Sequence, residues 1–191
     1  MCDLNRISAF LITIKVTYGL ILGGLGIAAV ASSSLFAAAG ATGVMLGLIA
    51  LMAVINFALR SIIEEINKCS VGQCSQEFAN LVGPLNWLQA SMIAFTAALI
   101  GLTVVAAIPF AGAVAIGVVL TAFAILTVAV SGGAEYQFAQ NAQAFNVCKQ
   151  SYGEQGLNEW VVLTPYFVMA MGLLFGIGAG ASIGNTAPPP K

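Results

Sequence analysis

The chain has 191 residues, of which 60% are apolar and only 7% are charged, and its formal net charge is −1. A soluble domain carries about 25% charged residues, so six basic and seven acidic side chains cannot cover a water-soluble globule of this size. Disordered chains are poor in apolar residues, and nucleic-acid binding needs a basic patch that this chain lacks. The absence of histidine excludes imidazole-based catalysis and metal binding. The composition therefore predicts an all-α, polytopic integral membrane protein.

Five segments are long and apolar enough to span a bilayer as helices, which requires about 20 residues each. They lie at residues 7–31, 35–59, 85–107, 110–130 and 160–184. The runs are continuous, whereas the strands of a β-barrel would be segments of about 10 residues with alternating polarity. The first apolar stretch ends in a signal-peptidase-like Ala29-Val30-Ala31, but its length and Lys15 favour an uncleaved span. We expect one membrane domain over residues 1–191, built from two helical hairpins and a final single span that contains Pro165.

The connections predict a strongly asymmetric molecule. Tight turns follow the first and third spans, whereas the loops at residues 60–84 and 131–159 are long and polar. Both long loops fall on the same face as the N-terminus, and the C-terminus falls on the other. The loop face also carries most cations and large polar aromatic residues: Arg6, Lys15, Arg60, Lys68, Lys149, Trp87, Trp160, Tyr18, Tyr136, Tyr152 and Tyr166. The positive-inside rule therefore predicts a cytoplasmic loop face and a C-terminus on the opposite side.

The two long loops share a weak internal repeat. Phe57-Ala58, Ile66-Asn67-Lys68-Cys69 and Gly83-Pro84-Leu85-Asn86-Trp87 correspond to Phe138-Ala139, Phe145-Asn146-Val147-Cys148 and Gly156-Leu157-Asn158-Glu159-Trp160. The repeating unit is a helical hairpin followed by a loop that bears a cysteine. Residues 60–80 have a helical period of apolar positions and are expected to continue the second helix beyond the membrane, and residues 131–150 are expected to do the same. Coincidence is the alternative, because membrane helices share start signals.

All four cysteines, Cys2, Cys69, Cys74 and Cys148, lie on the loop face. On a cytosolic face the expectation is four reduced thiols. In the opposite orientation Cys69–Cys74 and Cys2–Cys148 become candidate disulfides. A zinc or iron–sulfur site is a third possibility, but four intervening residues between Cys69 and Cys74 do not fit close metal-ligand pairs. We predict no cofactor and no metal.

Lys15 is the main charge inside a span, and it lies about 12 Å deep at 1.5 Å per residue. Charges within the hydrocarbon region usually have a function and a partner. Glu135, just past the fourth span on the same side, is the expected partner of Lys15. The alternatives are a lipid phosphate, another subunit, or snorkelling of the Lys15 side chain to the interface.

Glycines recur every four residues on three predicted helices. They are Gly172, Gly176, Gly180 and Gly184 on the last span, Gly19 and Gly23 on the first, and Gly43 and Gly47 on the second. Small residues at this spacing let helix backbones approach closely in lipid. We expect these stripes to pack against other helices, either in the same chain or in another subunit.

No catalytic constellation is present, so we expect no enzymatic activity. The leading hypothesis is a small structural or accessory subunit of a larger, potentially homo-oligomeric membrane assembly, with the bilayer and other membrane subunits as its partners and no nucleic acid. The second hypothesis is a channel or transporter for a small solute, lined by Lys15, Thr13, Thr17, Asn56 and the Ser and Thr residues of the third and fourth spans. The third is a membrane thiol-redox protein.

Overall fold

The computed structural model describes residues 2–31, 41–69, 71–106 and 113–186. Within these ranges every regular element is helical. The elements are α1 (Leu4–Ala31), α2 (Ala41–Lys68), the short 3-10 helix η1 (Gly72–Cys74), α3 (Ser75–Ala79), α4 (Val82–Ala106), α5 (Ala113–Ser151) and α6 (Glu159–Thr186). The expected turns at residues 31–34 and 107–109 fall largely outside the described residues.

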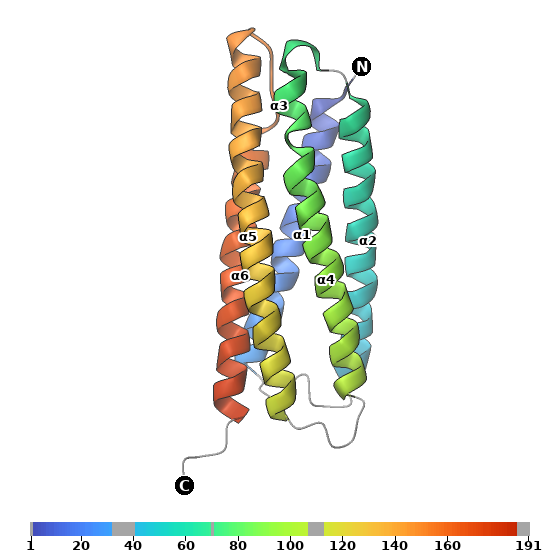
Figure 1. Cartoon of the computed structure of the whole chain (residues 1–191), viewed down its shortest axis with the longest axis vertical. Coiled ribbons are helices and arrows are strands. Elements are labelled where there is room, and N and C mark those ends of the chain that lie inside the picture. The colour runs from blue at the N-terminus through green and yellow to red at the C-terminus, as the bar shows by residue number, and fades with distance from the viewer. Residues whose placement is uncertain (1, 32–40, 70, 107–112, 187–191) are drawn as a thin grey trace.

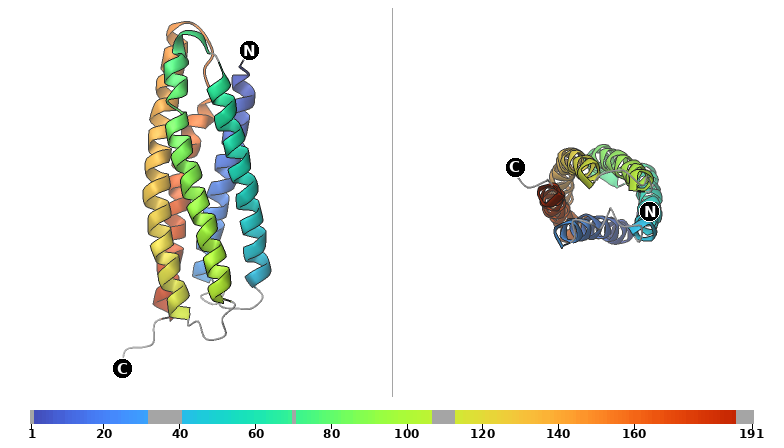
Figure 2. Two further views of the ribbon diagram at one scale, coloured as in Figure 1. Left: turned by 45° about the vertical axis from the view of Figure 1, so that its right-hand side comes forward. Right: turned by 90° about the horizontal axis from the view of Figure 1, so that it is seen from below.

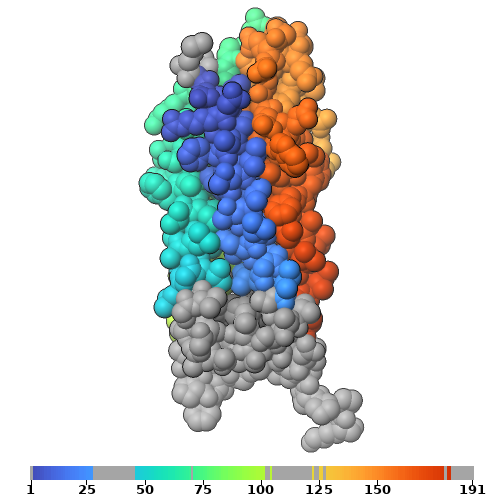
Figure 3. Space-filling view, turned by 180° about the vertical axis from the view of Figure 1, so that it is seen from behind, coloured from blue at the N-terminus to red at the C-terminus, as the bar shows by residue number. Residues whose placement is uncertain are grey.

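The five long helices run side by side along the long axis of the molecule (Figure 1). Seen from below, they form a ring (Figure 2). Each packs against two neighbours in the order α1, α2, α4, α5, α6, and the contact between α6 and α1 closes the ring. From behind, α1 lies between α2 and α6 (Figure 3). The fold is therefore a single closed layer of helices around a shared core.

The core follows from apolar residues spaced alternately by three and four positions. In α4 the buried series is Leu85, Leu88, Met92, Phe95 and Leu99. Helices that present a seam with a period of about 3.5 residues pack nearly parallel with a slight left-handed twist. The other long helices present similar series, which include Ile7, Leu11, Ile14, Tyr18 and Leu22 on α1, Met52, Ile55, Leu59, Ile62 and Ile66 on α2, Phe138, Ala142 and Phe145 on α5, and Val161, Val168 and Phe175 on α6.

The long loops are shorter than the sequence suggested. As expected, α2 continues past residue 59, but it ends at Lys68 instead of continuing to residue 80, and η1 and α3 follow as separate short helices. Most of the segment 131–159 is also helix, as expected for residues 131–150, because α5 runs unbroken for 39 residues to Ser151. Its Ala- and Gln-rich sequence keeps a buried stripe facing the bundle, so the helix continues beyond the apolar span. The non-helical connection is therefore confined to residues 152–158.

Three helices are long and apolar enough to cross a membrane: Leu4–Ile27, Leu46–Lys68 and Glu159–Gly178. Membrane character is thus a property of the described chain. The count of five spans is not established by length and composition over these residues.

Pro165 does not interrupt α6, although it lies inside that helix. Proline has no N–H, so it cannot bond to the carbonyl four residues earlier, which is that of Val161. The neighbouring Thr164 hydroxyl donates to that same carbonyl oxygen at 3.3 Å. This substitution of a side-chain donor for the missing backbone donor explains how the helix tolerates a proline.

Candidate functional site

The structure brings Lys15 and Glu135 together in the interior of the ring. Lys15 Nζ of α1 donates to Glu135 Oε2 of α5, and both side chains are fully buried. The two residues are 120 positions apart in the sequence, so this ion pair joins the first helix to the fourth long helix. It is a contact across the core rather than a contact with a lipid headgroup.

The ion pair has both aromatic and polar neighbours. Lys15 Nζ lies 3.6 Å from the centroid of the Phe138 ring, one turn along α5 from Glu135, which adds a cation–π contact. Tyr18 of α1 lies in the same buried region beside Ser91 of α4 and Ser131 of α5. Tyr18 was expected at the membrane interface, and its burial corrects that expectation. The interior therefore has a polar layer between apolar layers.

Burying two charges costs desolvation energy that their mutual attraction only partly offsets. The pair is consequently weak evidence for added stability. Removing one partner, in contrast, leaves an uncompensated charge in the core, which is strongly destabilising. The pair therefore specifies how α1 and α5 are placed relative to one another.

The cysteines form two disulfides, Cys2–Cys69 and Cys74–Cys148. The expectation of reduced thiols is wrong, and so is the alternative pairing of Cys69 with Cys74 and Cys2 with Cys148. All four sulfurs are used in these bonds, so none is a thiolate for a metal or a cluster. The sequence could not distinguish the three possible pairings, because the choice depends on how the helices are arranged in the ring.

Each disulfide joins the beginning of one hairpin to its end. Cys2 precedes α1 and Cys69 follows α2, whereas Cys74 precedes α4 and Cys148 lies in the last turn of α5. The sequence separations are similar, 67 and 74 residues. Each of the two hairpins is thus closed at the same end by one disulfide, and the internal repeat inferred from the sequence stays a prediction.

Further contacts fix the end of the bundle that holds the disulfides, here called the loop end and comprising residues 2–8, 69, 71–81 and 141–160. Lys149 Nζ donates to the Val71 carbonyl oxygen at 3.0 Å and also pairs with Glu154. The aromatic rings of Phe78 and Phe145 pack with centroids 4.9 Å apart. The loop end is thus bonded covalently and non-covalently across the whole ring.

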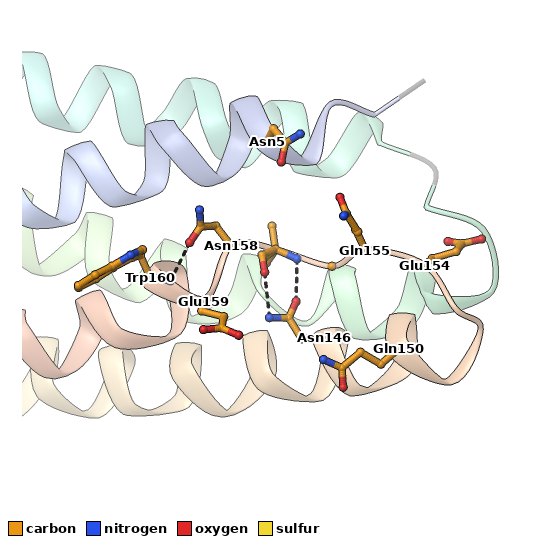
Figure 4. Close-up of a pocket in the computed structure, with 10 residues that line it drawn as sticks. Asn5, Asn146, Gln150, Glu154, Gln155, Asn158, Glu159 and Trp160 are labelled. Carbon is orange, nitrogen blue, oxygen red and sulfur yellow. Dashed lines mark hydrogen bonds between the residues drawn. The ribbon is translucent and has the colours of Figure 1, made fainter.

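A polar groove of about 560 Å³ opens at the loop end. It lies between the beginning of α1, the end of α5 and the connection to α6 (Figure 4). The side chain of Asn146 fixes the connection through two bonds, in which Nδ2 donates to the Leu157 carbonyl oxygen and Oδ1 accepts from the Leu157 N–H. The lining residues are mostly amides and carboxylates: Asn5, Asn146, Gln150, Glu154, Gln155, Asn158 and Glu159, with Gly156, Leu157 and Trp160. The sequence analysis missed this groove, although the Asn and Gln residues near positions 150–158 were a visible signal.

The glycines separate into an inner and an outer set. A methyl group on Gly19 would lie 2.7 Å from the Phe167 ring of α6, and one on Gly23 would meet Met171. The closest approach is between Gly26 and Gly178, where a methyl group on Gly178 would lie 2.7 Å from the Gly26 Cα atom. The expected stripes included Gly19 and Gly23 but missed Gly26 and Gly178. These glycines allow the backbones of α1 and α6 to touch.

The predicted stripe on α6 behaves differently. Gly172 is in ordinary contact with Val128 of α5, but methyl groups on Gly176 and Gly180 would meet open space. The same holds for Gly47 of α2. Gly43 and Gly184 lie outside the residues whose surroundings the structure describes. The outer part of the α6 stripe therefore does not serve packing within this chain.

The residues expected to line a pore are divided between the interior and the surface of the ring, and Ser91 of the third expected span is buried beside Tyr18. Lys15 is buried, but Thr13 is exposed and its hydroxyl donates back to the Ala9 carbonyl oxygen at 2.8 Å. Asn56 is half-buried and its amide donates to the Met52 carbonyl oxygen. The arrangement offers no continuous polar lining among these residues.

Comparison with protein-family models, with curated proteins and with solved structures finds no match to this chain.

Proposed function

We propose that the chain is a non-catalytic structural subunit of a membrane assembly, which docks on other subunits or on copies of itself through α6. The observation that carries this proposal is the outward position of Gly176 and Gly180. Glycines in a membrane helix permit close helix contacts, and these two make none within the chain. Their neighbours Leu173 and Ile177 are 59% and 66% exposed, so the same face offers apolar side chains for packing.

We further propose that all five long helices span the bilayer. Three of them are apolar and long enough by themselves, and α4 and α5 lie in the same ring between α2 and α6. Large apolar side chains on the outside of the ring occur on these two helices as well: Ile93, Ile100 and Val104 on α4, and Ile125 and Leu126 on α5. A bilayer around α1, α2 and α6 would therefore meet an apolar surface on α4 and α5.

The two disulfides favour the orientation opposite to the one that the positive-inside rule predicts. Disulfides persist in oxidising compartments, such as the periplasm, the extracellular space or the lumen of the endoplasmic reticulum. Lys15 pairs with Glu135 in the core, and the buried Lys149 pairs with the exposed Glu154, so the positions of these two lysines have a structural reason besides orientation. We propose that the loop end faces the oxidising compartment and the C-terminus faces the cytoplasm.

Reporter fusions at the C-terminus test the orientation. A green fluorescent protein fused there is expected to fluoresce, because it folds in the cytoplasm, and an alkaline phosphatase fused there is expected to be inactive. The reverse pattern would place the loop end in the cytoplasm and contradict the proposal.

The native mass of the full chain in a mild detergent tests the assembly. We expect a complex larger than one chain, and we expect Gly176→Leu and Gly180→Leu to shift it toward the monomer. Gly101→Leu is the matched control, since this glycine of α4 also faces open space. A monomeric wild-type protein that transports a solute in liposomes would favour the channel hypothesis instead. Equal effects of Gly176→Leu and Gly101→Leu would exclude α6 as the docking face.

A further inference from the structure

We propose that the groove at the loop end binds a neutral glycan. This inference goes beyond the structural role and does not depend on it. The groove has three properties that together select this ligand class: its hydrogen-bonding groups, its charge and its aromatic end.

The hydrogen-bonding groups are primary amides. Asn5 comes from α1, Gln150 from α5, and Gln155 and Asn158 from the connection to α6 (Figure 4). An amide side chain both donates and accepts hydrogen bonds, as does a sugar hydroxyl, so vicinal hydroxyls can bond to it in both directions. In the part of the chain that the structure describes, the side chains of Asn5, Gln150 and Gln155 have no hydrogen-bond partner.

One amide is held in a defined orientation. Asn158 Oδ1 accepts from the backbone N–H of Trp160 at 3.0 Å, which leaves the Asn158 Nδ2 group as a donor. The backbone N–H of Asn158 donates to the Ser8 hydroxyl of α1 at 3.2 Å, and Asn146 holds Leu157 beside it. The connection is thus fixed on both sides before any ligand arrives, which lowers the entropic cost of binding.

The charge of the groove argues against phosphate and other anions. Among the described lining residues none is a cation, whereas Glu154 and Glu159 are carboxylates. The nearest lysine, Lys149, is only 7% exposed and is already bonded to Glu154 and the Val71 carbonyl oxygen. The apolar lining is small, so an apolar ligand would bury little surface.

Trp160 lies at one end of the row of lining residues and Glu154 at the other (Figure 4). The Trp160 side chain is 63% exposed, so its flat face is available for stacking. The C–H groups on one face of a sugar ring pack on an indole, while the hydroxyls at its edge reach the amides. A short oligosaccharide along the row would use both kinds of contact.

The experiment is native mass spectrometry of the full chain released from nanodiscs, with two probes of the same chemistry. Maltotriose represents a free glycan, and diglucosyl-diacylglycerol in the bilayer represents a lipid headgroup. Diacylglycerol without sugar is the lipid control. We expect a sugar-dependent adduct with one or both probes, and the probe that binds identifies the source of the glycan.

Matched variants locate the site. Loss of one hydrogen bond or of the stacking contact, each about 1 kcal/mol, weakens binding about fivefold, which is the expectation for Gln150→Leu and Trp160→Ala. Gln140→Leu changes another exposed glutamine of α5, and Trp87→Ala changes a tryptophan of α4 with the same 63% exposure, and neither should alter binding. Absence of an adduct with both sugar probes overturns the proposal, and so does an adduct whose affinity is unchanged by both Gln150→Leu and Trp160→Ala.

Discussion

The two hairpins, α1–α2 and α4–α5, are closed by equivalent disulfides but are held together by different means. In the second hairpin α4 packs on α5 about as much as on α2, and α5 packs mainly on α6. In the first, α1 packs mainly on α6 and α2 packs mainly on α4, so the contact between α1 and α2 is the least extensive between neighbours in the ring. The Cys2–Cys69 bond crosses this seam at the loop end. The disulfide therefore joins the two neighbouring helices that have the least extensive packing contact.

The ion pair between Lys15 and Glu135 connects the two hairpins, and its loss gives the largest expected effect. Lys15→Met leaves the Glu135 carboxylate unpaired in the core and should lower the free energy of unfolding by about 3–5 kcal/mol. Thermal unfolding in mild detergent, followed by circular dichroism, measures the loss.

The double variant Lys15→Met with Glu135→Leu sharpens this result. It removes both charges, so it should recover most of the stability lost in the single variant. A double variant as unstable as Lys15→Met would show that the damage comes from packing rather than from the unpaired charge.

The disulfides allow a direct comparison of the hairpins. Loops of 67 and 74 residues give nearly equal loop-closure contributions, about 4 kcal/mol each. Replacing either pair by serine should therefore cost similar stability. The two variants should, however, lose protection from hydrogen exchange at different helices. Without Cys2–Cys69, hydrogen exchange should increase at the start of α1 and the end of α2, because little packing holds this seam closed.

The variant lacking Cys74–Cys148 is the control, since α4 and α5 should stay protected by their mutual packing. Equal exchange at both hairpins in the two variants would contradict the view that packing differs between them.

The contact of α1 with α6 sets a third test. A methyl group on Gly178 collides with the Gly26 backbone, so Gly178→Ala should destabilise the ring by about 1–3 kcal/mol. Gly176→Ala, half a turn away on the same helix, meets open space and should leave the melting temperature of the monomer unchanged. Similar losses in the two variants would show that helix propensity or the lipid environment matters more than the close approach.

The smallest expected effect concerns Pro165. Thr164→Val removes the donor to the Val161 carbonyl oxygen and should cost about 1 kcal/mol. Thr96→Val of α4 removes a similar bond, from Thr96 to the Met92 carbonyl oxygen, in a helix without proline at that position. The Thr96 variant should lose less stability, and an equal loss would argue against a special role for Thr164.

Local patterns were enough to predict the helices and the Lys15–Glu135 contact. Counting residues along each expected span gives the depth of Lys15 and places Glu135 on the same side of the membrane. Cysteine pairing depends on the order of helices around the ring, which hydropathy does not encode. The helical period of residues 131–150 predicted the continuation of α5 beyond the apolar span. The groove was not predicted, because Asn5 and Gln150 are far apart in the sequence and line the same groove only in the folded ring.

The position of α6 between α5 and α1 has a consequence for biosynthesis. Chains emerge from the ribosome N-terminus first, so α6, the main neighbour of α1, is synthesised after all the other helices of the ring. Until then the flank of α1 that carries Gly19, Gly23 and Gly26 is uncovered within the membrane. Insertion of α6 is thus the step that closes the ring, and a chain shortened before residue 159 would leave the same flank of α1 open to contact with other helices.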